Sequence, residues 1–231
     1  MKTIGMLGGM SWESTANYYR LINEGIKAKL GGLHSGKICM LSVDFDEIEK
    51  LQHAGNWVGA GEALATASQS IEAGGADFLI ICTNTMHKVV DQVEDSVSIP
   101  ILHIADATAE CLREQGISKV GLLGTAFTME QDFYKGRIQD NFGIEVIVPE
   151  TEERKSIHRV IYEELCLGKI LPESKQLFLK VIENLKANGA EGIILGCTEI
   201  SMLLAQEDTN IQLFDTAAIH AESAVKFAIA G

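Results

Sequence analysis

Short apolar runs alternate along this chain with longer amphipathic segments, from its first residues to its last. The apolar runs lack a regular exchange of polar and apolar positions, as is typical of strands covered on both faces. Such alternation predicts βα units arranged around parallel sheets. The runs that we expect to form strands are residues 3–7, 38–43, 78–82, 101–103, 120–123, 145–148, 192–195 and 212–214.

The longer segments carry apolar residues at helical spacing and predict helices between the strands. Thr128 and Gln131 have the spacing of a capping box and predict the start of one of them. The expected helices are residues 14–29, 59–73, 105–115, 129–141, 152–166, 173–187 and 217–229.

An internal repeat divides the chain. Residues 189–199 repeat residues 75–85 without a gap, and each copy has a helix end, an apolar strand and a small polar loop. This register places Cys197 opposite Thr83. The Gly-containing strands at 4–8 and 120–124 also correspond, with Tyr18 and Tyr134 at the same offset beyond them.

The repeat predicts an α/β fold of two similar lobes, each a parallel sheet flanked by helices, related by pseudo-twofold symmetry. We expect the first lobe to comprise residues 1–98 and 210–231, and the second residues 99–209. Open α/β sheets bind ligands at the carboxyl ends of their strands. If those ends face each other, the active site lies in the cleft between the lobes.

Composition narrows the function. The 231 residues carry a formal net charge of −13, with no basic run, which disfavours nucleic acid and anionic membranes as partners. No apolar run approaches the roughly 20 residues that span a bilayer, and no targeting segment is visible. The five cysteines are scattered without CxxC spacing, which favours a reducing cytoplasm and argues against a structural zinc site.

The two loops that the repeat aligns hold the best candidates for chemistry. Cys197 follows a predicted strand, and a helix start just beyond it would lower the thiol pKa and favour a nucleophilic, basic thiolate. An inert buried cysteine is the alternative. Thr83 can donate a hydrogen bond or relay a proton, whereas Cys82 should face the core because neighbouring side chains of a strand point oppositely.

Other polar groups are less specific. Gly8 and Gly9 let backbone N–H groups approach a small anion, but the loop lacks both dinucleotide-binding and P-loop spacing. His103 with Asp106, and His220 with Asp215, could form His–carboxylate contacts, which are more often structural than catalytic.

Three motifs together resemble the aspartate/glutamate racemase family, and the similarity extends along the whole chain. They are Gly-Gly-Met-Ser-Trp-Glu-Ser-Thr at 8–15, Asn-Thr-Met-His at 84–87 and Gly-Cys-Thr-Glu at 196–199. The resemblance implies a homodimer that acts on a small amino acid without pyridoxal phosphate, another cofactor or a metal.

The resemblance also implies roles for particular residues. Members of the family use one cysteine on each side of the substrate Cα. Cys197 matches the second cysteine, but Thr83 stands in the place of the first. The substrate site would be lined by Met10, Gln52, Asn84, Thr85, Thr125, Thr198 and Glu199.

These residues predict racemisation, most favourably of L-aspartate or L-glutamate, with Cys197 as the base and Thr83 as the opposite-face partner. Gln52, Arg159 and Lys169 are the nearest candidates to hold a distal carboxylate. The alternatives are a broader racemase of neutral amino acids, a hydantoin racemase, maleate isomerase or decarboxylase, and a non-catalytic amino-acid sensor. A nicotinamide-dependent dehydrogenase is disfavoured by the broken glycine motif.

Overall fold

The computed structural model describes residues 1–230 and divides the chain into two compact units. Unit 1 contains Met1–Ile104 and the segment that begins at His220, and unit 2 is the continuous stretch Ala105–Ile219. Each unit holds one four-stranded parallel sheet with helices around it. The expected α/β class with two similar lobes is therefore confirmed.

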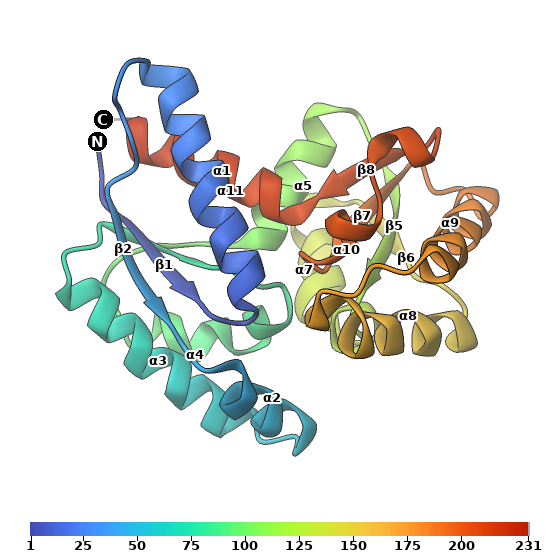
Figure 1. Ribbon diagram of the computed structural model, residues 1–231, viewed down its shortest axis with the longest axis horizontal. Coiled ribbons are helices and arrows are strands. Elements are labelled where there is room, and N and C mark those ends of the chain that lie inside the picture. The colour runs from blue at the N-terminus through green and yellow to red at the C-terminus, as the bar shows by residue number, and fades with distance from the viewer. Residues whose placement is uncertain (231) are drawn as a thin grey trace. The chain divides into compact units, whose positions relative to one another are not determined.

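The strands of unit 1 lie in the order β2-β1-β3-β4 and are all parallel. Figure 1 shows α1 and α11 on one side of this sheet and α3 with α4 on the other. In chain order, its elements are β1 (Ile4–Gly8), α1 (Trp12–Leu30), β2 (Ile38–Ser42), α2 (Phe45–His53), α3 (Trp57–Ala73), β3 (Phe78–Ile81), the 3₁₀ helix η1 (Thr85–Val89), α4 (Val90–Glu94), β4 (Ile101–Leu102) and most of α11 (Thr216–Ile229).

The sheet of unit 2 has the equivalent order β6-β5-β7-β8 and is also parallel. In chain order, its elements are α5 (Ile104–Glu114), β5 (Lys119–Gly124), α6 (Ala126–Glu130), α7 (Asp132–Phe142), β6 (Glu145–Ile147), α8 (Thr151–Glu163), η2 (Leu165–Leu167), α9 (Pro172–Ala187), β7 (Gly192–Gly196), α10 (Ile200–Leu203), η3 (Gln206–Asp208) and β8 (Gln212–Asp215).

The internal repeat of the sequence is a repeat of structure. β1 and β3 pair at the centre of one sheet as β5 and β7 pair at the centre of the other. Gly75 and Gly189 occupy the same turn before β3 and β7, with φ values of 90° and 92° that favour glycine. Tyr18 and Tyr134 are both fully buried.

The unit boundaries differ from the expected division of the chain. Residues 99–104 were expected in the second lobe, but β4 pairs with β3 and so lies in unit 1. Residues 210–219 were expected in the first lobe, but β8 pairs with β7 and lies in unit 2. Strand pairing, which a single sequence does not display, decides both assignments.

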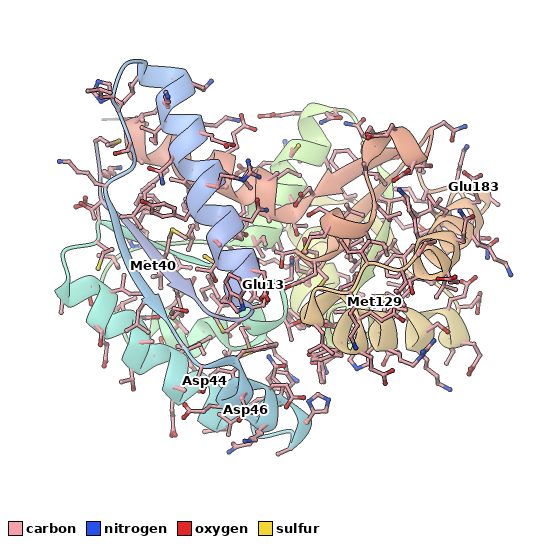
Figure 2. The ribbon with its side chains drawn as sticks, viewed as in Figure 1. Glu13, Met40, Asp44, Asp46, Met129 and Glu183 are labelled. Carbon is pink, nitrogen blue, oxygen red and sulfur yellow. The ribbon has the colours of Figure 1, made fainter. Side chains whose placement is uncertain are left out.

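All eight predicted strands are present, but some of the helices differ from the prediction. The helix expected at 129–141 is two helices, α6 and α7, that separate at Gln131. The predicted capping box is wrong, because Thr125 is the N-cap of α6 and its Oγ1 accepts from the Thr128 N–H at 3.4 Å. α2 was not predicted; Figure 2 shows Asp44 and Asp46 at its start, where Asp44 accepts from the Asp46 N–H at 3.1 Å.

Apolar side chains fill both faces of the central strands. In unit 1 the core includes Leu7, Leu64, Ile71 and Ile81, each at most 1% exposed. Among the described residues, no helix combines the length and the apolar character needed to cross a membrane.

Two equivalent glycines let a helix pack closely on each sheet. A methyl group on Gly5 would lie 2.7 Å from Ile71 Cγ2 of α3 and 2.8 Å from the backbone oxygen of Phe78. A methyl group on Gly121 would instead meet the flexible ends of Ile193 at 2.7 Å and Leu185 of α9 at 2.9 Å. The neighbours of Gly121 can therefore adjust, whereas the backbone beside Gly5 cannot.

We predict that Gly5→Ala lowers the free energy of unfolding by about 1–3 kcal/mol, as expected for overpacking of a core. The matched variant Gly121→Ala should cost less, because side-chain rotation relieves its clash. Urea denaturation followed by circular dichroism measures both. An equal or larger loss in Gly121→Ala would contradict this account.

Candidate active site

The polar residues of unit 1 that the sequence singled out follow β1 and β3, the two central strands of its sheet. Leu7 lies opposite Ile81 in the strand register, so the loops after Gly8 and Ile81 leave the same edge of the sheet. Met10 is 4% exposed in the first loop. Thr83, Asn84 and Thr85 follow in the second loop.

The glycine loop after β1 is a compact turn. Gly9 has φ 93°, and a Cβ there would lie 2.2 Å from the Val43 carbonyl oxygen. The Gly9 N–H donates to Thr15 Oγ1 at 2.8 Å, and the Ser14 N–H donates to Ser11 Oγ at 3.3 Å. The Gly9 N–H, one of the backbone donors that were expected to approach an anion, thus bonds to a side chain of α1.

The turn after β3 separates a core cysteine from an accessible threonine. Cys82 is fully buried, and burial raises the pKa of its thiol, so its predicted place in the core is confirmed. Thr83 is half-buried, and its N–H donates to the Ile81 carbonyl at 2.9 Å. This tight turn carries Thr83 out of the sheet.

Asn84 and Thr85 start the 3₁₀ helix η1 and are 2% and 6% exposed. Asn84 makes further interactions, while its Oδ1 atom is buried and accepts no hydrogen bond from the described residues. Gln52, 3% exposed on α2, donates through Nε2 to Met86 Sδ at 2.9 Å. Four of the five residues predicted in unit 1 therefore gather around η1.

A cation near this turn was missed by the sequence analysis. Residues three positions apart lie on the same face of a 3₁₀ helix, so Lys88 lies on the same face of η1 as Thr85. Its Nζ lies 3.8 Å from the centre of the Trp57 ring, a cation–π contact, and partial burial lowers its pKa. The motif Asn-Thr-Met-His-Lys carried this signal, because the lysine ends the same short turn.

In unit 2 the predicted residues lie at the equivalent strand ends. Gly124 of β5 is opposite Gly196 of β7, so Thr125 and Cys197 leave neighbouring strands at the same level. Thr125 is 5% exposed and caps α6. Cys197, Thr198 and Glu199 are 8%, 6% and 4% exposed.

A buried carboxylate organises these last three residues. Glu199 Oε2 accepts from the Cys197 thiol at 2.9 Å and from the Thr198 hydroxyl at 2.8 Å. Because a carboxylate only accepts when ionised, both neighbours must direct their protons toward it. The arrangement joins a thiol, a hydroxyl and a carboxylate in one hydrogen-bonded group.

The pKa of Cys197 is raised well above the ordinary thiol value, first by burial and then by the charges of Glu199 and Cys166. The expected lowering by a helix is wrong, since α10 is a four-residue helix whose field is too short to offset burial. Burial and these charges therefore favour the protonated thiol of Cys197.

The two aspartates that were expected to contact histidines bond to other groups. Asp106 forms a two-pronged ion pair with Arg137 at 2.6 and 2.7 Å, and Asp215 caps the start of α11. Arg159 lies exposed on α8, 3.9 Å from Glu163, and Lys169 is exposed after η2. Within residues 1–230, no group of three or more His, Cys, Asp and Glu side chains is arranged to hold a metal ion.

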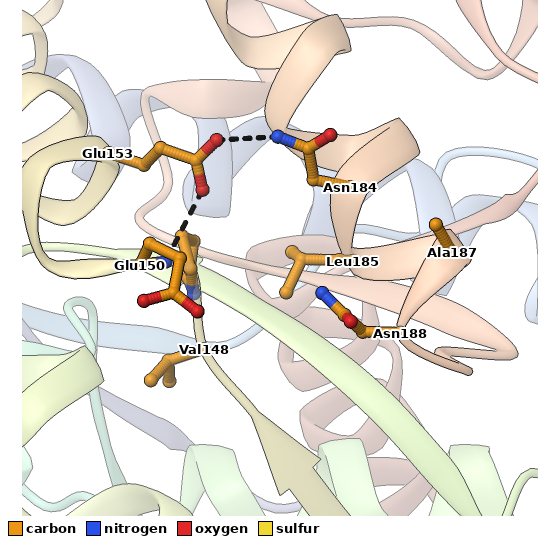
Figure 3. Close-up of a pocket in the computed structure, with 8 residues that line it drawn as sticks. Val148, Glu150, Glu153, Asn184, Leu185, Ala187 and Asn188 are labelled. Atoms are coloured by element: carbon orange, nitrogen blue, oxygen red, sulfur yellow. Dashed lines mark hydrogen bonds between the residues drawn. The ribbon is translucent and has the colours of Figure 1, made fainter.

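A cavity of about 200 Å³ elsewhere in unit 2 is lined by none of the predicted residues. It lies between the start of α8 and the end of α9, where Glu153 accepts from Asn184 Nδ2 at 2.6 Å (Figure 3). Its two glutamates, Glu150 and Glu153, form the N-terminal capping box of α8.

Comparison with known proteins identifies the family to which the chain belongs. The model of the Asp/Glu/hydantoin racemase family matches residues 7–224. The chain belongs to this family. A candidate Asp/Glu racemase from Yersinia pestis is 53% identical, with a TM-score of 0.93, over 99% of this chain and 100% of that one.

More distant members are similar over most of the chain. An aspartate racemase homologue from Pyrococcus horikoshii is 35% identical, with a TM-score of 0.85, over 99% of both chains. A broad-specificity amino-acid racemase from Bacillus subtilis is 24% identical over 183 residues, which are 79% of this chain and 73% of that protein. This member of the Asp/Glu racemase family thus has the two-unit α/β architecture of its structural relatives.

The chemistry of Cys197 leads to a measurable prediction. Its alkylation by iodoacetamide should rise with pH through a midpoint above the ordinary thiol range of about 8.5, because only the thiolate reacts. Glu199→Gln should shift this midpoint down, because it removes the negative charge that opposes ionisation. Peptide mass spectrometry distinguishes Cys197 from the other four cysteines.

The same cysteine in the urea-unfolded chain supplies the reference. A midpoint in the folded protein at or below this reference would contradict the raised pKa of Cys197. An unchanged midpoint in Glu199→Gln would instead remove the carboxylate as one of its causes.

Proposed function

We propose that this family member is a cofactor-independent amino-acid racemase in which Cys197 and Thr83 act on opposite faces of the substrate Cα. The observation that carries the proposal is the hydrogen bond from the Cys197 thiol to the buried Glu199 carboxylate, at the strand end equivalent to that of Thr83. It gives an otherwise protonated thiol a route to the thiolate.

The first step generates the base. The Cys197 proton moves along the 2.9 Å hydrogen bond to Glu199, leaving a thiolate beside a neutral carboxylic acid. The thiolate then takes the Cα proton of the L-amino acid, and the bonding electrons remain on the planar, carbanion-like intermediate. Glu199 was expected to contact the substrate. In this proposal it instead accepts the proton of Cys197.

The second step completes inversion. The Thr83 hydroxyl donates its proton to the opposite face of Cα, and the resulting alkoxide recovers a proton from water. The proton held by Glu199 neutralises the hydroxide that is formed, so every group returns to its starting state. Because a hydroxyl is a far weaker acid than a thiol, this should be the slower of the two proton transfers. Asn84, Thr85 and Thr198 would hold the α-carboxylate and stabilise its developing charge. Met10, Gln52 and Thr125 complete the proposed substrate site.

The proposed substrates are L-aspartate and L-glutamate. The similarity to the Yersinia pestis protein supports acidic substrates, and Lys88, one 3₁₀ turn beyond Thr85, is a cation suited to a distal carboxylate. Neutral amino acids are the second candidate, because the Bacillus subtilis relative is a broad-specificity racemase. By resemblance to the family, we further propose a homodimer that works in the cytoplasm.

Deuterium labelling tests the reaction directly. We expect the protein, incubated with L-aspartate or L-glutamate in deuterated water, to form the D-isomer labelled at Cα, because inversion brings in a solvent proton. Proton NMR and chiral chromatography follow label and configuration together. Cys197→Ala should abolish D-isomer formation, and Thr83→Cys should accelerate turnover of the D-isomer by restoring a second thiol.

Each other result would name a different function. Binding of an amino acid without exchange or inversion would indicate a sensor. Loss of CO₂, or a product other than the mirror image, would indicate one of the related Cα-acid enzymes. Unchanged D-isomer turnover in Thr83→Cys would remove Thr83 from the proposed mechanism.

Lys88 allows the substrate class to be tested separately. Lys88→Met keeps the apolar stem on Trp57 but removes the charge, so KM for L-aspartate and L-glutamate should rise about tenfold or more. That change corresponds to loss of one charge-assisted contact. KM for a neutral substrate such as L-glutamine should stay within about twofold, and Lys88→Arg is the charge-preserving control. A parallel rise for acidic and neutral substrates would show that Lys88 does not read the distal carboxylate.

A further inference from the structure

Three buried histidines lie together behind the Thr83 turn in unit 1. His87, His103 and His220 are 1%, 4% and 0% exposed. The ring centres of His87 and His103 are 4.4 Å apart, and those of His87 and His220 are 6.1 Å apart. The proposed chemistry uses none of these rings, although buried polar groups are costly unless they are hydrogen-bonded.

Hydrogen bonds determine the protonation of His220. Its Nε2 lies 2.8 Å from the Leu102 carbonyl, which can only accept, so Nε2 carries the proton. Its Nδ1 lies 3.0 Å from the Tyr18 hydroxyl, which then donates to it. Burial lowers the pKa of His220 to about 4, only partly countered by the Leu102 carbonyl, so the ring is neutral at physiological pH.

The same reasoning fixes the tautomer of His87. Its Nδ1 lies 2.8 Å from the Thr83 carbonyl and must donate to it. The Ile104 N–H donates to the other ring nitrogen, Nε2, at 3.4 Å, which requires a lone pair there. A neutral ring with its proton on Nδ1 satisfies both bonds, whereas the opposite tautomer satisfies neither.

This bond has a consequence for Thr83. The Thr83 N–H is held by the Ile81 carbonyl, and the Thr83 carbonyl is held by His87. Because both peptide groups beside the residue are fixed, rotation about χ1 is the main freedom left to its hydroxyl. A proton donor needs such restriction, since a displacement of about 1 Å can cost roughly a hundredfold in rate.

We propose that His87 is a positioning residue for Thr83, acting through the hydrogen bond from Nδ1 to the Thr83 backbone carbonyl. The proposal rests on the racemase function proposed above. The neutral ring, anchored also by the Ile104 N–H, fixes the turn from which the hydroxyl meets the substrate. His87 itself touches neither substrate nor the transferred proton.

Two amide substitutions separate this role from simple filling of the core. The amide nitrogen of an asparagine can take the place of Nδ1, whereas the longer glutamine places its amide near Nε2. We expect His87→Asn to keep D-isomer formation within about threefold of the native protein. His87→Gln should lose on the order of a hundredfold in kcat with KM little changed, because the Thr83 carbonyl loses its donor.

Melting temperature and Cys197 alkylation serve as controls in both variants. Equal losses of kcat in the two variants, or no loss in His87→Gln, would overturn the proposal. A second measurement does not depend on activity or on the variants folding: ¹⁵N NMR of the imidazole rings should show His87 protonated at Nδ1. A proton at Nε2 would overturn the proposal, whereas Nδ1 protonation in a protein that racemises nothing would count against the racemase function alone.

Discussion

Each half of this protein depends on the parallel pairing of its two central strands. The pairing of β1 with β3, and of β5 with β7, brings polar loops that are distant in sequence to one edge of each sheet. The pairing is possible because apolar residues such as Leu7 and Ile194 bury both faces of the strands. Burial of the strands thus also determines the environment of the groups at their ends.

That environment has opposite effects in the two units. At the end of β7, burial and a neighbouring carboxylate favour the protonated form of Cys197, and the same carboxylate is the proposed acceptor of its proton. At the end of β3, the bonds from the Thr83 N–H to the Ile81 carbonyl and from His87 to the Thr83 carbonyl hold the backbone of the residue instead. At equivalent positions of the duplicated fold, nearby charge and burial thus determine the protonation of Cys197, whereas hydrogen bonds determine the backbone position of Thr83.

The sequence predicted much of this fold because the dominant signals were local. Apolar runs located every strand, and the gapless alignment of 75–85 with 189–199 predicted the equivalent topology. α2 was missed although Asp44 followed by Glu47 has the spacing of a helix start, since its apolar stripe is short. Unit boundaries failed where strand pairing decides them, as for β4 and β8.

The site was predictable as a set of residue types but not as a set of interactions. Motifs located Thr83 and Cys197, yet the length of α10 and the approach of Glu199 are products of the folded loop. The contact of His87 with Thr83 spans four residues and is local, but its tautomer depends on Ile104, seventeen residues away. Lys88 was overlooked because its stacking on Trp57 joins separate helices.

Unit 1 is built from two separate segments of the chain, and this determines which unit is completed first during synthesis. Ribosomal synthesis runs from the N-terminus, so all of Ala105–Ile219 is completed before the segment that begins at His220. Until then unit 1 lacks the side chains of α11, including Phe227, whose ring packs edge-on against Phe78 at 4.8 Å, and His220, which binds Tyr18. The half that is begun first is thus finished last, and a nascent chain stalled near residue 219 would display one complete sheet domain beside an uncovered one.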